Sequence, residues 1–272
     1  MTNEKLDAAL AKKWEQLFGE LSGYSSAVIA YSGGVDSSLL VYAAVQAIGQ
    51  KVAAVTVVSP ILAQSMLDQA SAFASEIGFS HIVLQVEQLA DQVFISNPPD
   101  RCYYCKKLYL DRLVEYAKEH HLEVVLEGQN ADDLCDYRPG GRAVKESGVR
   151  SPLAENGFTK QEIRLLARYF GLTVWDQPST PCLATRIPYG SPVTEIALRQ
   201  IEQAEKYLLE QGFQVVRVRH LDDEARIEVL PDKIGGLVSI REEIVKVFRE
   251  IGYKYVTIDL QGYRMGSLNE VL

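Results

Sequence analysis

The residue types best suited to chemistry form one short run near the amino terminus, Tyr31-Ser32-Gly33-Gly34-Val35-Asp36-Ser37-Ser38. It lies between an apolar stretch (27–30) and an amphipathic one (39–48), an order that predicts strand, tight loop and helix. Paired glycines let the backbone turn sharply, the serines offer hydroxyls, and a helix amino terminus adds unpaired N–H groups and a favourable dipole. The loop is therefore predicted to bind phosphate. It lacks the Walker A lysine and the glycine spacing of dinucleotide folds, which disfavours γ-phosphate transfer and NAD binding.

The run resembles the PP-loop of the ATP pyrophosphatases, which cleave ATP between its first and second phosphates and leave AMP on an acceptor oxygen. This resemblance implies that Ser32, Gly33, Gly34, Ser37 and Ser38 hold the nucleotide phosphates. It also implies a catalytic role for the carboxylate next to them, Asp36, which would help to hold a Mg²⁺ ion that bridges the phosphates of ATP.

Cysteines form the second candidate site. Cys102 and Cys105 make a Cys-Tyr-Tyr-Cys motif at the predicted start of a helix, and Cys182 stands in a later loop. Three thiols in two loops suggest metal ligation, with a redox pair or inert thiols as alternatives. The remaining cysteine, Cys135, is surrounded by carboxylates that oppose thiolate formation, so we interpret it as non-ligating.

Three thiolates around a 4Fe-4S cluster would leave one iron without a protein ligand. Such an iron can hold a sulfide, which suits sulfur delivery to an acceptor. An ATP-binding loop that forms an adenylate would supply that acceptor.

The rest of the chain predicts an α/β fold with a parallel, doubly wound sheet and a small α+β domain at the carboxyl end. Apolar strands at 27–30, 52–58, 81–86 and 124–126 alternate with helices at 62–77 and 104–120, and Thr159 is a plausible cap for a helix at 159–170. After a proline-rich segment, helix 194–211, strands 213–221 and 225–230, helix 234–251 and strand 253–260 are expected. We therefore place the ATP-binding domain at 1–178 and the second domain at 179–272.

Composition excludes several function classes. The chain has 272 residues, 47% of them hydrophobic, and a formal charge of −8. No apolar run approaches a membrane span, and no export signal is visible, so a reducing cytoplasmic location is expected. Because the total charge is acidic, a small-molecule substrate is favoured over a nucleic acid.

Arginines offer a third site. Arg217 and Arg219 are two apart on a predicted strand and share a face, so they could clamp a phosphate, or simply be solvated on an edge strand. Arg186, four residues after Cys182, could neutralise a carboxylate or the cluster, or lie on the surface. Among the histidines, His81 is expected in a capping or surface role, and only His220 stays open as a functional residue.

Over nearly its full length (27–266) the chain resembles the LarE-type sulfur transferases of nickel-pincer nucleotide cofactor synthesis. The resemblance is carried by these motifs: Asp136-Tyr137-Arg138-Pro139-Gly140, Arg150-Ser151-Pro152-Leu153, Cys182 with Arg186-Ile187-Pro188-Tyr189-Gly190, Ala204-Glu205-Lys206-Tyr207-Leu208 and Arg217-Val218-Arg219. It implies a PP-loop domain of the adenine nucleotide alpha-hydrolase type, adenylation of pyridinium-3,5-biscarboxylic acid mononucleotide, replacement of AMP by sulfur to give a thiocarboxylate, and homo-oligomers.

Family members differ in their cysteines. Those with only the cysteine matching Cys182 sacrifice its sulfur, whereas Cys102 and Cys105 match the three-cysteine members, in which a 4Fe-4S cluster carries the sulfide. Single-cysteine members have a metal-binding carboxylate in the last helix, where this chain has Gly235-Gly236, so Glu205 alone is a weak metal candidate.

The sequence thus predicts an ATP-dependent sulfurtransferase. The nearest alternative is a tRNA-thiolating PP-loop enzyme, which would need a basic groove. An amide-forming ligase would need no cluster, and a nucleotide or iron-sulfur sensor would bind ATP without producing pyrophosphate.

Overall fold

The computed structural model describes residues 6–134, 139–178, 181–264, 266 and 268. The chain divides into two compact units, one formed by residues 1–88 and 100–180 and the other by residues 89–99 and 181–272. The division after residue 180 lies close to the expected boundary after 178. The segment 89–99, which we expected in the first domain, belongs to the second unit. There the Asn97 amide donates to the carbonyl oxygens of Pro188 (2.7 Å) and Ser191 (3.0 Å), a long-range link that no local sequence pattern reveals.

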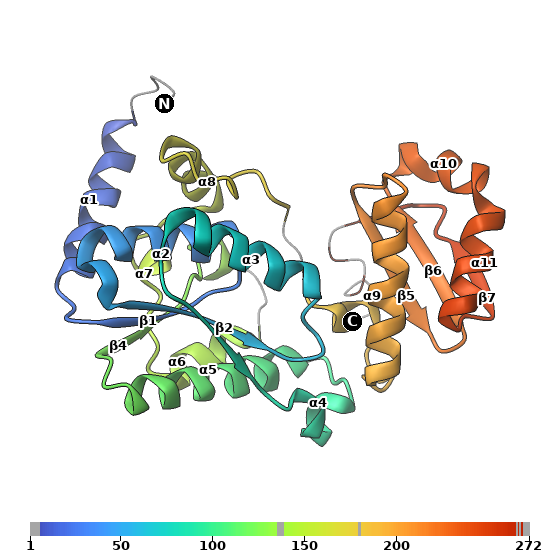
Figure 1. The fold of residues 1–272 in the computed structure, drawn as a ribbon, viewed down its shortest axis with the longest axis horizontal. Coiled ribbons are helices and arrows are strands. Elements are labelled where there is room, and N and C mark those ends of the chain that lie inside the picture. The colour runs from blue at the N-terminus through green and yellow to red at the C-terminus, as the bar shows by residue number, and fades with distance from the viewer. Residues whose placement is uncertain (1–5, 135–138, 179–180, 265, 267, 269–272) are drawn as a thin grey trace. The chain divides into compact units, whose positions relative to one another are not determined.

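The first unit is built around four parallel strands in the order β3-β2-β1-β4, as the alternation of strands and helices predicted. Its elements are α1 (Ala8–Ser22), β1 (Ala27–Ala30), α2 (Val35–Ile48), β2 (Val52–Val58), α3 (Gln64–Ile77), β3 (His81–Gln85), α5 (Arg101–Glu119), β4 (Val124–Leu126), α6 (Gly140–Ser147), α7 (Pro152–Glu155) and α8 (Lys160–Tyr169). The helices α2 and α3 cover one face of the sheet, and α5 and α6 cover the other (Figure 1).

Two apolar cores explain why this sheet is doubly covered. β1 is buried along its whole length, with Ile29 facing the core under α2 and α8, and Val28 facing the core under α5 and α6. Strands that are apolar at every position can bury both faces, which is the pattern of parallel sheets. Because α2 also lies deep in its core, most of its first ten residues are buried, and the amphipathic pattern expected for it is largely absent.

The second unit contains a three-stranded sheet in the order β5-β6-β7, in which β5 and β6 are antiparallel and β6 and β7 are parallel. Its elements are α4 (Gln92–Ile95), α9 (Glu195–Glu210), β5 (Val216–Leu221), β6 (Glu224–Val229), α10 (Ile234–Ser239), α11 (Arg241–Ile251) and β7 (Tyr255–Ile258). The apolar faces of α9, α10 and α11 share one core with this sheet.

One helix of the second unit was predicted wrongly. The continuous helix expected at 234–251 is two helices, separated at Ile240, whose φ of −113° and ψ of 26° are not helical. Glu242 and Glu243 lie in the first turn of α11, where negative charge complements the helix dipole and favours a new helix start.

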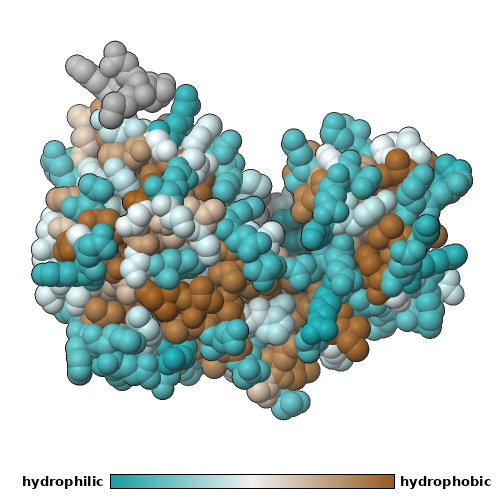
Figure 2. Space-filling model, in the orientation of Figure 1, coloured by the Kyte–Doolittle hydropathy of each residue, from teal (hydrophilic) through white to brown (hydrophobic). Residues whose placement is uncertain are grey.

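The surface is mainly hydrophilic, with apolar residues in smaller groups, on the face shown in Figure 2. Within the described part of the chain, no helix has the length and apolar character needed to cross a bilayer.

Candidate active site

The predicted phosphate loop lies where β1 ends and α2 begins, at the carboxyl edge of the parallel sheet. The first helical hydrogen bond runs from Ser38 N to Gly34 O (3.0 Å). The N–H groups of Val35, Asp36 and Ser37 precede it and are available at the helix start. Ser37 also braces the loop, because its hydroxyl donates to Gly34 O (3.1 Å) and accepts from Ser32 N (3.2 Å).

Two glycines let neighbouring elements approach this loop closely. Gly33 has a φ of +76°, and a Cβ built on it would lie 3.0 Å from the Cβ of Ala70 on α3. Gly128, just after β4, was not singled out from the sequence. A Cβ at Gly128 would lie 2.9 Å from the backbone nitrogen of Ser37, so only glycine lets this segment reach the first turn of α2.

Asp36 is held by two side chains that sequence reasoning missed. Its carboxylate forms an ion pair with Lys160, the first residue of α8, and accepts a 3.4 Å hydrogen bond from the amide of Asn130. Lys160 could have been found from the Thr159 cap, because that cap sets the start of α8. The structure confirms the cap as a full capping box with Glu162. A Mg²⁺ ion bound by Asp36 would replace the Lys160 ammonium, and a single carboxylate with nucleotide phosphates is a donor set that Mg²⁺ accepts.

Ser38 differs from the expectation that it holds phosphate. Its side chain is fully buried and its N–H belongs to the helix, so its hydroxyl faces the interior beside Tyr31. Burial raises the pKa of Tyr31 to about 12, which keeps this phenol protonated. The phosphate-binding roles of Ser32, Gly33, Gly34 and Ser37 stay predictions.

The Cys-Tyr-Tyr-Cys motif forms the first turn of α5, which begins at Arg101, three residues before the expected start at 104. Cys102 is exposed and Cys105 is partly exposed, and the Cys105 thiol lies 3.6 Å from the Gln88 side-chain oxygen. Residues three apart on a helix lie on the same face, so both thiols can serve one ligand. Cys135 and the expected motif residues 136–138 lie outside the described residues.

Cys182 belongs to the second unit, where it precedes a single 3-10 turn, Leu183–Arg186. Among the described residues, no cluster of three or more His, Cys, Asp or Glu side chains is arranged to hold a metal ion. The ligation of a cluster by Cys102, Cys105 and Cys182 therefore stays a prediction.

Arg186 is neither a surface residue nor placed as a free cation. It is 1% exposed, and its guanidinium makes a bidentate ion pair with Glu205 on α9, both contacts measuring 2.8 Å. Its other terminal nitrogen donates to the carbonyl oxygens of Pro181 (2.8 Å) and Cys182 (3.0 Å). Arg186 thus neutralises the Glu205 carboxylate and holds the backbone of the Cys182 loop, so only the alternative of a surface residue is wrong, and its catalytic role stays a prediction.

The same contacts account for Glu205, the weak metal candidate. Its carboxylate also accepts a 2.9 Å hydrogen bond from the backbone N–H of Val218 on β5. A carboxylate with these partners is already neutralised in the interior.

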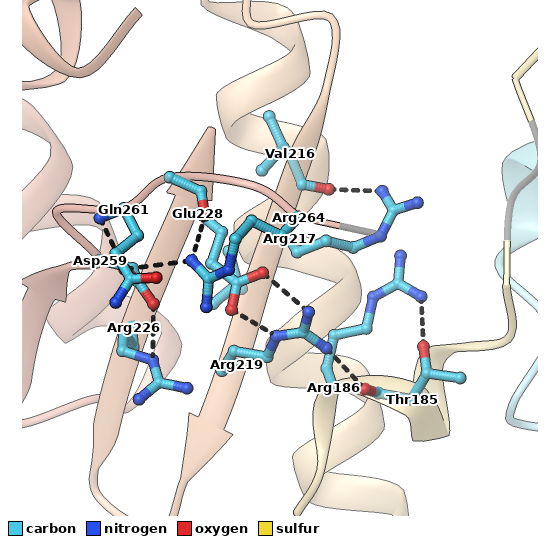
Figure 3. A network of polar contacts seen from close by, with 12 residues as sticks. Thr185, Arg186, Val216, Arg217, Arg219, Arg226, Glu228, Asp259, Gln261 and Arg264 are labelled. Carbon is cyan, nitrogen blue, oxygen red and sulfur yellow. Dashed lines mark hydrogen bonds and ion pairs between the residues drawn. The ribbon is translucent and has the colours of Figure 1, made fainter. Parts of the chain in front are cut away.

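Arg217 and Arg219 lie on β5, and the expectation that Val216 and Val218 face the core is confirmed. The two arginines differ from each other, however (Figure 3). Arg219 is 7% exposed, makes a bidentate 2.7 Å ion pair with Glu228 on β6, and donates to Thr185 O. It is therefore not solvated, and its charge is balanced.

Arg217 is less constrained than Arg219. Its guanidinium donates to its neighbour's carbonyl, Val216 O, and lies 5.2 Å from the ring centroid of Tyr263. Burial lowers its pKa, and the nearby positive charge of Arg186 lowers it further. An anion would relieve this repulsion, so Arg217 is the better phosphate candidate of the two.

Among the histidines, only His220 was left open as a functional residue by the sequence. His220 lies 3.3 Å from the Tyr253 hydroxyl, and burial lowers its pKa. His81, expected in a capping or surface role, is instead half-buried, with its ring nitrogens 2.8 Å from Thr56 Oγ1 and 3.4 Å from Ser71 Oγ. That expectation was wrong, because His81, although it begins the edge strand β3, contacts Thr56 on β2 and Ser71 on α3.

Comparison with known proteins tests the family assignment. The sequence model of the asparagine synthase family matches residues 28–174, more than half of the chain. A pyridinium-3,5-bisthiocarboxylic acid mononucleotide synthase of Lactiplantibacillus plantarum is 36% identical over 97% of this chain and 96% of its own length. The chain belongs to the LarE-type family of PP-loop proteins.

Two uncharacterised proteins are also similar to this LarE-type chain. One, from Synechocystis sp., is 44% identical over 94% of this chain and 96% of its own length. The other, from Methanocaldococcus jannaschii, is 31% identical over 87% of this chain and 90% of its own length.

Family membership confirms two expectations at once. The parallel α/β sheet with the loop at its carboxyl edge is the PP-loop fold, and the protein is an ATP-dependent enzyme. Apart from segment 89–99, the match to the asparagine synthase family lies in the first unit, whereas the LarE-type similarity also spans Cys182 and the arginines of the second unit.

Proposed function

We propose that this LarE-type protein is an ATP-dependent sulfurtransferase that converts a carboxylate of pyridinium-3,5-biscarboxylic acid mononucleotide into a thiocarboxylate. The observation that carries the proposal is the full-length similarity to an enzyme named for the bisthiocarboxylic acid product. The thiols at Cys102, Cys105 and Cys182 and the phosphate loop supply the residue types that both halves of this reaction need.

The first half-reaction is adenylation. A substrate carboxylate oxygen attacks the α-phosphorus of ATP, the bond from that phosphorus to the pyrophosphate oxygen breaks, and an acyl adenylate remains. The loop N–H groups and Ser37 would orient the phosphates, and Asp36 would hold Mg²⁺, which offsets charge on the departing pyrophosphate. Lys160, released from Asp36, would face the same phosphates.

The second half-reaction replaces AMP with sulfur at the carboxyl carbon. We propose that Cys102, Cys105 and Cys182 ligate a 4Fe-4S cluster, which when bound would supply sulfide to the adenylate. Arg217 would bind the phosphate of the mononucleotide, with Arg219 fixing the strand beside it.

The cluster is tested by anaerobic purification, visible absorption, and iron and sulfide analysis. With inorganic sulfide supplied, a brown protein that forms several thiocarboxylates per chain is expected, and Cys102→Ser with Cys105→Ser should remove both colour and turnover. Cys135→Ser is the matched control and should change neither. An iron-free wild-type protein that thiolates one substrate per chain and loses Cys182 sulfur would show sacrifice of Cys182 instead.

The two half-reactions are separated by two substitutions. Cys182→Ala should abolish thiocarboxylate formation and spare pyrophosphate release, whereas Asp36→Ala should slow pyrophosphate release by roughly 100-fold or more. Pyrophosphate is measured by a coupled assay and thiocarboxylate by mass spectrometry. Loss of pyrophosphate release in Cys182→Ala would assign that residue to adenylation, and full activity of Asp36→Ala would refute the proposed Mg²⁺ site.

A further inference from the structure

The peptide unit between Tyr31 and Ser32 leads from β1 into the nucleotide loop and is held at both ends. The Tyr31 carbonyl accepts a 2.7 Å hydrogen bond from the Thr56 hydroxyl on β2. The Ser32 N–H donates to the Ser37 hydroxyl at 3.2 Å. Because Gly33 follows with a φ of +76°, the orientation of this peptide sets the direction of the loop backbone.

His81 completes this support from β3. Its Nε2 lies 2.8 Å from Thr56 Oγ1, and its Nδ1 lies 3.4 Å from the Ser71 hydroxyl on α3. A carbonyl oxygen can only accept, so the single hydroxyl proton of Thr56 goes to Tyr31 O. His81 Nε2 must therefore donate to Thr56, and Nδ1 is left to accept from Ser71.

Aromatic and backbone contacts tie the same residues to α3. The rings of Tyr31 and His81 meet edge to face, with centroids 5.3 Å apart, and the Tyr31 hydroxyl donates to Ala70 O at 3.2 Å. Ala70 is also the residue against which Gly33 packs. The start of the loop is thus braced from two strands and one helix.

We propose that His81, acting through Thr56, is a positioning residue that fixes the phosphate-facing N–H groups of the nucleotide loop. It contacts the loop's support and not the nucleotide. Burial lowers the pKa of His81, so the ring is neutral near pH 7, as the assigned tautomer requires. The proposal depends on ATP binding by the loop and not on the sulfur chemistry.

The test is the dissociation constant of a non-cleavable Mg-ATP analogue, measured by titration calorimetry together with ligand-free thermal unfolding. His81→Leu should weaken binding about five- to tenfold, the equivalent of one lost positioning hydrogen bond. His81→Gln, whose side-chain N–H can replace Nε2–H, should restore most of the affinity. His120→Gln, at the end of α5, is the matched control and should bind normally.

A double-mutant cycle tests whether His81 acts through Thr56. Thr56→Val should weaken binding about as much as His81→Leu, and the double variant should be little worse than either. Normal binding by a folded His81→Leu protein would overturn the proposal. Equal weakening by Leu and Gln would also overturn it, because it would show that ring packing and not the donated proton matters.

Discussion

At the scale of single residues, charge pairing decides which arginines are available for chemistry. Arg186 and Arg219 have their guanidinium groups paired with Glu205 and Glu228 inside the second unit. Arg217 carries a lowered pKa because burial and the neighbouring Arg186 both disfavour its charge. Arg217 therefore stays the better candidate for binding an anion, and Arg186 holds the loop that carries Cys182.

Glu205→Gln tests this structural role. Removing one charge from a buried ion pair leaves Arg186 uncompensated, so we expect a loss of about 3 kcal/mol in the free energy of unfolding. The measurement is urea unfolding followed by circular dichroism. Glu210→Gln is the control on the same helix, because its pair with Lys206 is solvent-exposed and should contribute little. A Glu205→Gln protein of unchanged stability would return Glu205 to the metal candidates.

At the scale of elements, the site depends on close approach between the end of β4 and the start of α2. The segment after β4 supplies Gly128, which touches the Ser37 backbone, and Asn130, which donates to Asp36. The capping box at Thr159 starts α8 so that Lys160 meets Asp36. Strand ends and helix starts thus converge on one carboxylate.

Gly128→Ala tests the close approach. A methyl group 2.9 Å from the Ser37 nitrogen must push the two segments apart, so we expect a loss of about 1–3 kcal/mol in stability and weaker Mg-ATP binding. Thermal unfolding and titration calorimetry measure the two effects. Gly235→Ala, with no atom within 4 Å of the new methyl group, should be neutral or slightly stabilising in α10. Unimpaired Mg-ATP binding by Gly128→Ala would contradict the role assigned to this contact.

At the scale of the whole molecule, each unit has a half-buried histidine whose pKa is lowered by its partial burial, His81 in the first and His220 in the second. A lowered pKa means that the unfolded chain takes up protons that the folded chain does not. Stability contributed by the neutral histidines is present above the unfolded pKa of about 6.5 and is lost as the pH falls below it.

We therefore expect the thermal unfolding midpoint to decrease when the pH is lowered from 7.5 to 5.5. The double variant His81→Gln with His220→Gln should show a shallower decline, measured by calorimetry at matched ionic strength. If the thermal midpoint of the double variant decreased with pH as steeply as that of the wild type, other groups would be responsible for the acid sensitivity.

Local sequence signals predicted much of the fold. The strands at 27–30 and 52–58 have the bounds that were expected, and Thr159 caps its helix as predicted. Apolar runs, side-chain periodicity and caps act over a few residues, so they can be recognised without a structure. The loop motif likewise predicted the PP-loop family, which the comparisons confirm.

The sequence by itself determined the phosphate loop, the parallel sheet and the set of residues able to do chemistry. Only the tertiary structure decided that Arg186 pairs with Glu205, that Gly128 and Lys160 contact the phosphate loop, and that segment 89–99 joins the second unit. The physical reason is that residue type fixes what a side chain can do, whereas its burial and charge partners come from distant parts of the chain.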